Sequence, residues 1–174
     1  MTRTVEPRAK GATSDVVDGL LALSRTLVAT VARSLAQVDE DVTVGQYRAL
    51  VVLASDGPQR TSDLAQQLDV TSSTVTRMCD RLYRKQLVRR YRRSDDRRAA
   101  WIMLTPTGLE LVGEIMRKRR AALVRLARTI PPEHRDALAS GLHAVVAAAG
   151  ELPEHEWWKR WRVAADPDPL MVEG

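Results

Sequence analysis

The sequence predicts a mainly α-helical fold with one small β-hairpin. Apolar residues recur every three or four positions through most of the chain. One stretch rich in Val, Ile, Tyr and Trp lacks that spacing, and Pro or Gly residues mark the breaks between segments. With 174 residues, of which 44% are apolar, the chain is long enough for one domain with a sizeable core.

The first predicted helix covers residues 15–38. Its apolar residues follow steps of three and four and trace one helical face. This stripe is wider than a single core-facing side requires, because Leu21 and Val28 lie beside it. A wide stripe indicates a second surface to bury. Three residues can cap the first turn: Thr13, Ser14 and Asp15.

Three shorter helices are predicted next. The first ends at the turn of residues 56–58, and the second follows Thr61 as its cap. After a link of only three residues, 69–71, another helix begins with Thr71 or Ser72 as its cap. Its inward side is apolar. Its outward side is polar and cationic: Ser73, Thr76, Arg77, Asp80, Arg81 and Arg84.

A β-hairpin and two further helices complete the expected fold. Residues 87–93 and 99–104 are rich in β-branched and aromatic side chains and predict the two strands. Thr105-Pro106 starts a helix with a capping hydroxyl and a proline in its first turn, and Pro131-Pro132 ends it. The last helix covers about residues 133–150.

The remaining residues, 151–174, contain three of the chain's seven aromatic side chains, interleaved with basic residues. The three aromatics are Trp157, Trp158 and Trp161. Such a segment is typical either of attachment to a membrane surface or of packing against other helices, here the first and last long helices of the chain. We favour packing, because the stretch is barely three turns long. The longest all-apolar run, 144–149, is far too short to span a bilayer.

Positive charge is concentrated in one part of the chain. The whole chain has a net charge of +5, but residues 60–98 hold eleven Lys and Arg against five Asp and Glu, a net of +6. The alternative interpretation is an ordinary solvated surface. Because the charge coincides with two short linked helices and the hairpin, we interpret it as a footprint for duplex DNA.

Residues 61–112 resemble the MarR family of winged helix-turn-helix regulators. The segment Ser73–Arg77, the tripeptide Asp96-Arg97-Arg98 between the strands, and Leu104-Thr105 leading to Gly108 carry this resemblance. The flanking helices also match in number and order. One departure is Gln86, where the family usually has a glycine that closes the recognition helix. Gln86 must therefore adopt a left-handed conformation, or the helix must end differently.

The resemblance implies a division of the chain into three parts. Residues 1–13 are expected to form a mobile arm, residues 14–150 a MarR-type domain, and residues 151–174 a Trp-rich extension. Within the domain, the expected parts are a winged helix-turn-helix unit at about 44–105 and dimerisation helices at about 15–38 and 106–150.

The resemblance also implies how DNA is bound. The recognition helix would enter the major groove, with its N-terminal hydroxyls on phosphates and Thr76 and Arg77 at base edges. Between the strands, Asp96 would orient Arg98 toward the minor groove, while Arg97 would face phosphate. The expected DNA-contacting residues are Ser72, Ser73, Thr74, Thr76, Arg77, Arg81, Arg84, Asp96, Arg97 and Arg98.

The resemblance further implies a homodimer joined through the first and last helices, which would explain the wide apolar stripe. The partner is then a pseudo-palindromic operator in double-stranded DNA, and a small aromatic or anionic effector would release it. Four residues near the expected effector cleft are candidates, and each is equally consistent with a surface or capping role: Arg25, Gln46, Tyr47 and Arg48. We therefore predict an effector-responsive transcriptional regulator, a repressor rather than an activator. The alternative is a constitutive DNA-organising protein without an effector.

The sequence offers little support for other chemistry. Its single cysteine, Cys79, falls on an inward helix face, so we expect a buried structural thiol and a cytoplasmic protein without disulfides. The three histidines lack the spacing of metal ligands. The sequence also contains no nucleophile elbow and no phosphate-binding loop. We therefore expect no enzyme activity, no metal and no cofactor.

Overall fold

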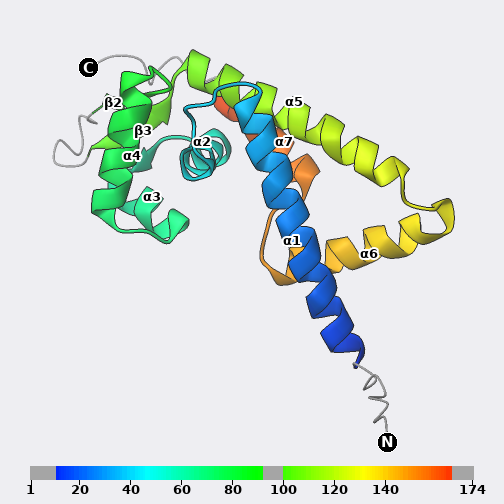
Figure 1. Ribbon diagram of the computed structural model, residues 1–174. Coiled ribbons are helices and arrows are strands. Elements are labelled where there is room, and N and C mark those ends of the chain that lie inside the picture. Colours follow the sequence, from blue (N-terminus) through cyan, green and yellow to red (C-terminus); the bar gives the residue numbers. More distant parts are fainter. Residues whose placement is uncertain (1–10, 92–99, 166–174) are drawn as a thin grey trace, which may run out of the picture.

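The computed structural model describes residues 11–91 and 100–165, which form seven α-helices and a three-stranded antiparallel sheet. The helices are α1 (Ala12–Ala36), α2 (Val44–Asp56), α3 (Thr61–Leu68), α4 (Ser72–Arg84), α5 (Pro106–Arg128), α6 (Pro132–Ala148) and α7 (Glu154–Ala165). The strands are β1 (Gln59–Arg60), β2 (Val88–Tyr91) and β3 (Trp101–Leu104). Figure 1 shows that α2, α3, α4 and the sheet gather into one lobe, from which α1, α5 and α6 extend. The fold is therefore mainly helical, as predicted.

The predicted hairpin is present, but it belongs to a larger sheet with the strand order β1-β3-β2. Strands β2 and β3 pair antiparallel, with Val88 opposite Leu104 and Tyr91 opposite Trp101. The strand β1 was not predicted. It pairs with β3 on the other side, with Gln59 opposite Ile102. The sheet thus connects the start of α3 to the hairpin.

Two predicted helix caps are wrong. The helix α1 begins at Ala12, and Gly11 is its N-cap residue without a side-chain hydrogen bond. Thr13, Ser14 and Asp15 consequently lie inside the first turn, where the carboxylate of Asp15 faces the positive end of the helix dipole.

The helix α3 is capped by Arg60 rather than by Thr61, because β1 runs directly into the helix. The Thr61 N–H instead donates to the Ala100 carbonyl at 3.4 Å.

Other boundaries are confirmed. Thr71 caps α4, and its side chain accepts a hydrogen bond from the Thr74 N–H. Thr105 caps α5 in the same way and accepts from the Gly108 N–H, with Pro106 in the first turn. The helix α2 ends at Gly57, as the predicted turn requires.

The core lies mainly in the lobe and the first half of α5, and it includes Leu35 of α1 and Trp157 of α7. Its fully buried side chains come from every element of the lobe except β1, and α5 adds Val112 and Ile115, with Met116 nearly buried beside them. The largest are Leu50, Leu64, Val75, Cys79, Leu82, Val88, Ile102, Val112 and Ile115. By contrast, α6 contains no buried residue.

The tail packs on the lobe. Trp157 is buried, and its ring lies 5.4 Å, centroid to centroid, from the rings of Trp158 and Trp161. Trp161 in turn covers Gly113 of α5, and Arg160 reaches Asp56 at the end of α2 with an N to O distance of 3.4 Å. The tail therefore packs on the protein, as expected, but it lies mainly along α2 of the lobe and reaches α5 through Trp161. Among the described helices, none is long and apolar enough to cross a bilayer.

Candidate nucleic-acid interface

The helix α4 has one buried and one exposed side. Val75, Cys79 and Leu82 are fully buried and fix the helix to the core. The hydrophilic side chains of the opposite side are exposed, apart from Asp80, which is half-buried: Ser72, Ser73, Thr76, Arg77, Arg81 and Arg84. The predicted division of this helix into an apolar and a cationic side is confirmed.

Hydroxyl groups cluster at the N-terminus of α4. The Oγ1 of Thr71 lies 3.0 Å from the Ser73 hydroxyl and 2.9 Å from the Thr74 hydroxyl. The Thr76 hydroxyl donates to the Ser72 carbonyl at 2.9 Å. The positive end of the helix dipole is therefore surrounded by small hydroxyl groups and carries no acidic residue in its first turn. Such a terminus suits an anion.

The C-terminus of α4 closes through Gln86, which adopts the left-handed conformation with φ of 59°. The Leu87 N–H donates to the Leu82 carbonyl at 3.0 Å, and the Gln86 N–H donates to the Tyr83 carbonyl at 2.9 Å. This pair of hydrogen bonds is a Schellman motif. The first of the two alternatives for Gln86 is thus correct: the helix ends at its usual place with a strained non-glycine residue.

The first turn of α5 holds this end of α4 in place. The Thr105 hydroxyl donates to the Gln86 carbonyl at 2.6 Å, and the Thr105 N–H donates to the Leu87 carbonyl at 3.1 Å. Gly108 lies directly above, where a Cβ atom would approach the Leu87 carbonyl oxygen to 2.0 Å. Only glycine permits this close contact, so Gly108 and Thr105 together set where β2 leaves the helix.

Two basic residues of the charged segment, Lys85 and Arg90, form ion pairs within the chain. The Lys85 ammonium donates to both carboxylate oxygens of Asp39, at 3.0 and 3.1 Å. Arg90 of β2 pairs with Asp80 of α4, and its guanidinium lies 5.9 Å from the centroid of the Tyr83 ring. The net charge of +6 over residues 60–98 gave no indication of these pairs. The acidic run of residues 39–41 was the available signal for a partner of Lys85.

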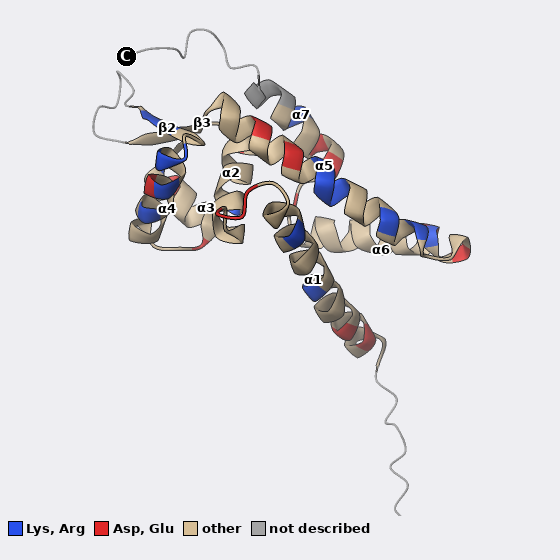
Figure 2. Cartoon of the chain, turned by 45° about the horizontal axis from the view of Figure 1, so that its top comes forward, with Lys and Arg blue, Asp and Glu red and all other residues tan. Residues whose placement is uncertain are grey.

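On α4, the cations that point outward are Arg77, Arg81 and Arg84. Within the part of the chain that the structure describes, none of them has an ion pair. Figure 2 shows the resulting band of Lys and Arg on α4 at one edge of the lobe. The acidic loop that precedes α2 contacts the end of α4 through Lys85, which pairs with Asp39.

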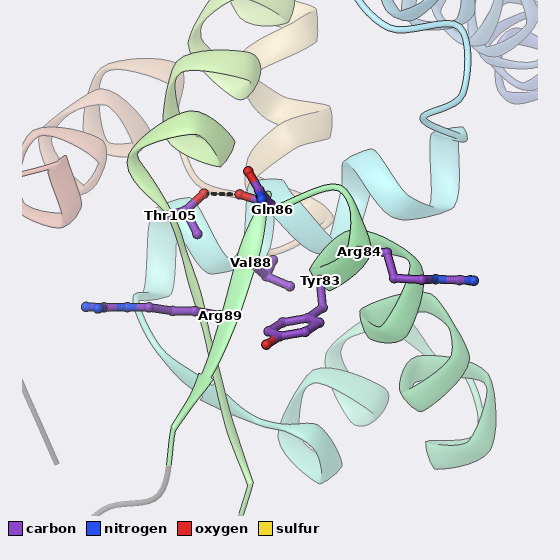
Figure 3. Close-up of a pocket in the computed structure, with 6 residues that line it drawn as sticks. All are labelled: Tyr83, Arg84, Gln86, Val88, Arg89 and Thr105. Atoms are coloured by element: carbon purple, nitrogen blue, oxygen red, sulfur yellow. Dashed lines mark hydrogen bonds between the residues drawn. The ribbon is translucent and has the colours of Figure 1, made fainter.

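An open hollow of about 370 Å³ lies between the end of α4 and β2. Figure 3 shows the Tyr83 ring between Arg84 and Arg89, whose side chains point to opposite sides. Gln86, Val88 and Thr105 complete the lining. The hollow therefore lies beside the C-terminal end of α4, with Arg84 and Arg89 at its rim.

Three of the expected DNA-contacting residues, Asp96, Arg97 and Arg98, lie outside the described residues. The strands that lead into and out of this segment are in place, because β2 ends at Tyr91 and β3 begins at Trp101.

The effector candidates divide into two groups. Arg25 and Arg48 are exposed, whereas Gln46 and Tyr47 are buried on α2. Gln46 forms a capping box with Thr43, since its side-chain oxygen accepts from the Thr43 N–H at 2.9 Å while its own N–H donates to the Thr43 hydroxyl.

The Tyr47 hydroxyl donates to the Met116 sulfur of α5 at 2.9 Å. Burial raises the pKa of Tyr47, although nearby Arg119 acts in the opposite direction. The structure thus places Gln46 and Tyr47 side by side near the start of α2 and gives Gln46 a capping role.

Cys79 is a buried free thiol on the inward side of α4. Burial raises its pKa to about 11, so the thiol is protonated at neutral pH. This agrees with the structural role expected for it. In the described ranges, no three His, Cys, Asp or Glu side chains lie together as metal ligands.

A short helix pair, a hydroxyl-rich cationic second helix and a sheet packed beside its end define a winged helix-turn-helix protein. Comparison with known proteins supports this class. The MarR family model matches residues 42–100. The HTH-type transcriptional repressor MdtR of Bacillus subtilis is 30% identical over 147 residues, which cover 84% of this chain and 93% of MdtR. The chain belongs to the MarR family of DNA-binding transcriptional regulators.

Further comparisons give the same fold. The HTH-type regulator YhbI of B. subtilis is 44% identical over 72 residues, 41% of this chain and about half of YhbI, at 47%. The crystal structure of RV1404 from Mycobacterium tuberculosis has a TM-score of 0.76 at 36% identity and covers 84% of this chain and 99% of its own. A Staphylococcus aureus MepR mutant bound to an oligodeoxyribonucleotide has a TM-score of 0.58 at 22% identity. This match covers 80% of this chain and 99% of the MepR chain.

Proposed function

We propose that the protein is a dimeric repressor that binds a pseudo-palindromic operator and releases it when a small molecule binds. In this proposal, each copy inserts α4 into the major groove. The single observation that carries it is the exposed side of α4, where a hydroxyl-rich N-terminus is followed by Arg77, Arg81 and Arg84 without ion-pair partners in the described chain.

Each group on this side has a proposed partner. Ser72, Ser73 and Thr74 donate to phosphates at the helix N-terminus. Thr76 and Arg77 meet base edges. Because the Thr76 hydroxyl hydrogen is already donated to the Ser72 carbonyl, Thr76 offers DNA an acceptor and a methyl group. Further along the helix and in the wing, the proposed contacts are Arg81, Arg84, Asp96, Arg97 and Arg98.

Exposed apolar side chains support the dimer. On α1, Leu21 is 55% and Val28 is 60% exposed, and α6 exposes Leu138, Leu142 and Val145. Apolar surface of this extent, on helices that lack a core of their own, favours association with a second copy. Two copies place two recognition helices on one face of DNA, as a pseudo-palindrome requires.

Repression is supported by a relative. MdtR, 30% identical to this chain, is named a transcriptional repressor. For the effector we retain the four candidates from the sequence, with Tyr47 foremost. It is buried between α2 and α5 and close enough to Arg119 for that cation to influence its pKa. In this proposal Arg119 is the cation for a small aromatic anion, and Tyr47, which is only 4% exposed, is uncovered when the anion binds.

Selection of bound sequences from a random duplex library tests the proposal. A repressor of this kind is expected to select a pseudo-palindrome and to bind it about 10³-fold or more tightly than random duplex. A constitutive DNA-organising protein would bind all duplexes similarly. Transcription from a promoter that carries the selected site then measures repression directly.

Arg77→Ala tests the place of α4 in the groove. If Arg77 contacts a base, its loss weakens operator binding by about 1–3 kcal/mol and relaxes the sequence preference. An equal loss on operator and random duplex would assign Arg77 to phosphate. Arg125→Ala, which removes the same charge from the far end of α5, is the control.

A further inference from the structure

We propose that Asp39 is a positioning residue for DNA binding: it holds Lys85 and thereby fixes the C-terminal end of α4 relative to the connection between α1 and α2. The inference rests on the proposed function in one respect, namely that α4 is the helix that enters DNA. Neither residue touches DNA in this proposal.

The pair joins parts of the chain that are 46 residues apart. Both carboxylate oxygens of Asp39 accept from the Lys85 ammonium, at 3.0 and 3.1 Å. Each side chain is only 27% exposed. Both carboxylate oxygens therefore take part in the ion pair, and it is partly shielded from water, whereas an ordinary surface ion pair is fully solvated.

Asp39 is itself held firmly. Its N–H donates to the Leu35 carbonyl at 2.9 Å, its side chain accepts from the Asp41 N–H at 2.9 Å, and its carbonyl accepts from the Val42 N–H at 3.2 Å. Leu35 and Val42 on either side are buried in the core. Burial raises the pKa of Asp39, but the hydrogen bonds from Lys85 and the Asp41 and Val42 backbone outweigh it, so its pKa lies below the usual range. The carboxylate is thus a fixed negative point at neutral pH.

Lys85 stands where a small displacement has the greatest effect on α4. It is the C-cap residue, and its N–H donates to the Arg81 carbonyl at 3.2 Å. The next residue, Gln86, is the left-handed residue from which the chain turns into β2. Holding Lys85 therefore fixes both the direction of the recognition helix and the start of the wing.

Asp41 is a natural control in the same loop. Its carboxylate is 3.8 Å from the Lys85 ammonium and 87% exposed. Asp41 therefore carries the same charge as Asp39 but does not fix the position of Lys85. If only charge mattered, neutralising either aspartate would strengthen DNA binding, because a negative group near the interface is removed. If Asp39 positions α4, its neutralisation weakens binding. The two accounts predict opposite signs for Asp39.

The test compares Asp39→Asn, Asp41→Asn, Lys85→Gln and Lys85→Arg on the selected operator and on random duplex. We expect Asp39→Asn and Lys85→Gln each to weaken operator binding about three- to tenfold, with a smaller loss on random duplex. The double variant should lose no more than either single variant, because both remove one interaction. Lys85→Arg should retain most of the affinity, and Asp41→Asn should bind as the wild type does.

Asparagine keeps the acceptor for the Asp41 N–H, so Asp39→Asn is expected to fold, and its thermal melting is measured beside its DNA binding. Tighter operator binding by Asp39→Asn, equal effects of Asp39→Asn and Asp41→Asn, or additive losses in the double variant would each overturn the proposal. Failure of the proposed function is distinguishable, since the wild type would then select no operator or Arg77→Ala would bind normally.

Discussion

The lobe and the extended helices bury apolar side chains to very different degrees. In the lobe, Leu50, Leu64 and Val75 are completely buried within a single chain. On the extended helices, defined as α1, the second half of α5, and α6, large apolar side chains remain exposed, with Leu142 at 38% and Val28 at 60%. A single chain thus buries the apolar core of the lobe, whereas the apolar side chains of the extended helices need a further surface to cover them.

This difference indicates that the two regions obtain stability from different sources. Substitutions in the lobe should lower the free energy of unfolding of each chain. Substitutions on the extended helices should instead weaken association between chains, if a second copy is what covers them. The expected effects below are ordered from the largest to the smallest.

Leu21→Glu should weaken association most, by about 5 kcal/mol in the free energy of dimer dissociation. Each dimer would lose two buried leucines, at about 1.5–3 kcal/mol each, and would have to bury two carboxylates. Sedimentation equilibrium at several concentrations measures this change. Thr26→Glu introduces the same charge about 140° around the helix and should dissociate as the wild type does. Unchanged association of Leu21→Glu would place the interface elsewhere.

Leu64→Ala should lower the stability of the folded chain and leave the association between chains unchanged. Its side chain is fully buried in α3, so truncation is expected to destabilise the folded chain by about 4 kcal/mol through lost burial and a cavity. Urea unfolding measures the loss, while the dissociation constant of the dimer should stay the same wherever the protein remains folded. Gln67→Ala, on the exposed side of the same helix, should change stability by less than about 0.5 kcal/mol. A large change in the dimer dissociation constant with Leu64→Ala would show that the lobe also contributes to association.

Gly108→Ala should destabilise the lobe by about 3 kcal/mol, because the new methyl group meets the Leu87 carbonyl oxygen at 2.0 Å and the start of α5 must shift. The matched control is Gly45→Ala on α2, whose Cβ atom would lie 3.7 Å from the flexible end of Met78. That control should be neutral or slightly stabilising. Thermal unfolding compares the two, and similar melting would show that α4 and α5 are not held at this contact.

Gln86→Gly should give the smallest effect, a gain of about 1 kcal/mol, because glycine adopts a φ of 59° without strain. Asp69→Gly is the partner measurement, since Asp69 also has a positive φ, of 54°, at the end of α3. Its gain should be smaller, because aspartate tolerates this conformation better than glutamine does. Chemical unfolding of both variants tests the ranking. A loss of stability in Gln86→Gly would mean that the glutamine side chain stabilises the turn.

Local signals explain which parts of the fold could be predicted from sequence. Thr71 and Thr105 cap helices through hydrogen bonds within three residues, and the turn after α2 depends on its own Gly57, so each is visible in a short stretch of chain. The division of α4 into buried and exposed sides follows from its periodicity in the same way.

Contacts between distant residues could not be predicted. The strand β1 consists of two residues, and it exists because β3, about forty residues later, pairs with it. That pairing also made Arg60 rather than Thr61 the cap of α3. For the candidate site, the exposed cations of α4 were predicted, but the hold of Asp39 on Lys85 was not, because nothing in either local stretch specifies the other.

Because α7 packs on α2, the core around α2 stays incomplete until the C-terminal part of the chain has been synthesised. Asp56 and Arg160, which lie in contact, are 104 residues apart. At about 5–20 residues per second, the ribosome needs about 5–20 s to make the intervening chain. During that interval, the surface of α2 that Trp157 and its neighbours later cover is open to water and to chaperones that bind apolar segments. The tryptophans of α7 are thus the last part of the core to arrive, and ribosome stalling before Glu154 would prolong the exposure of α2.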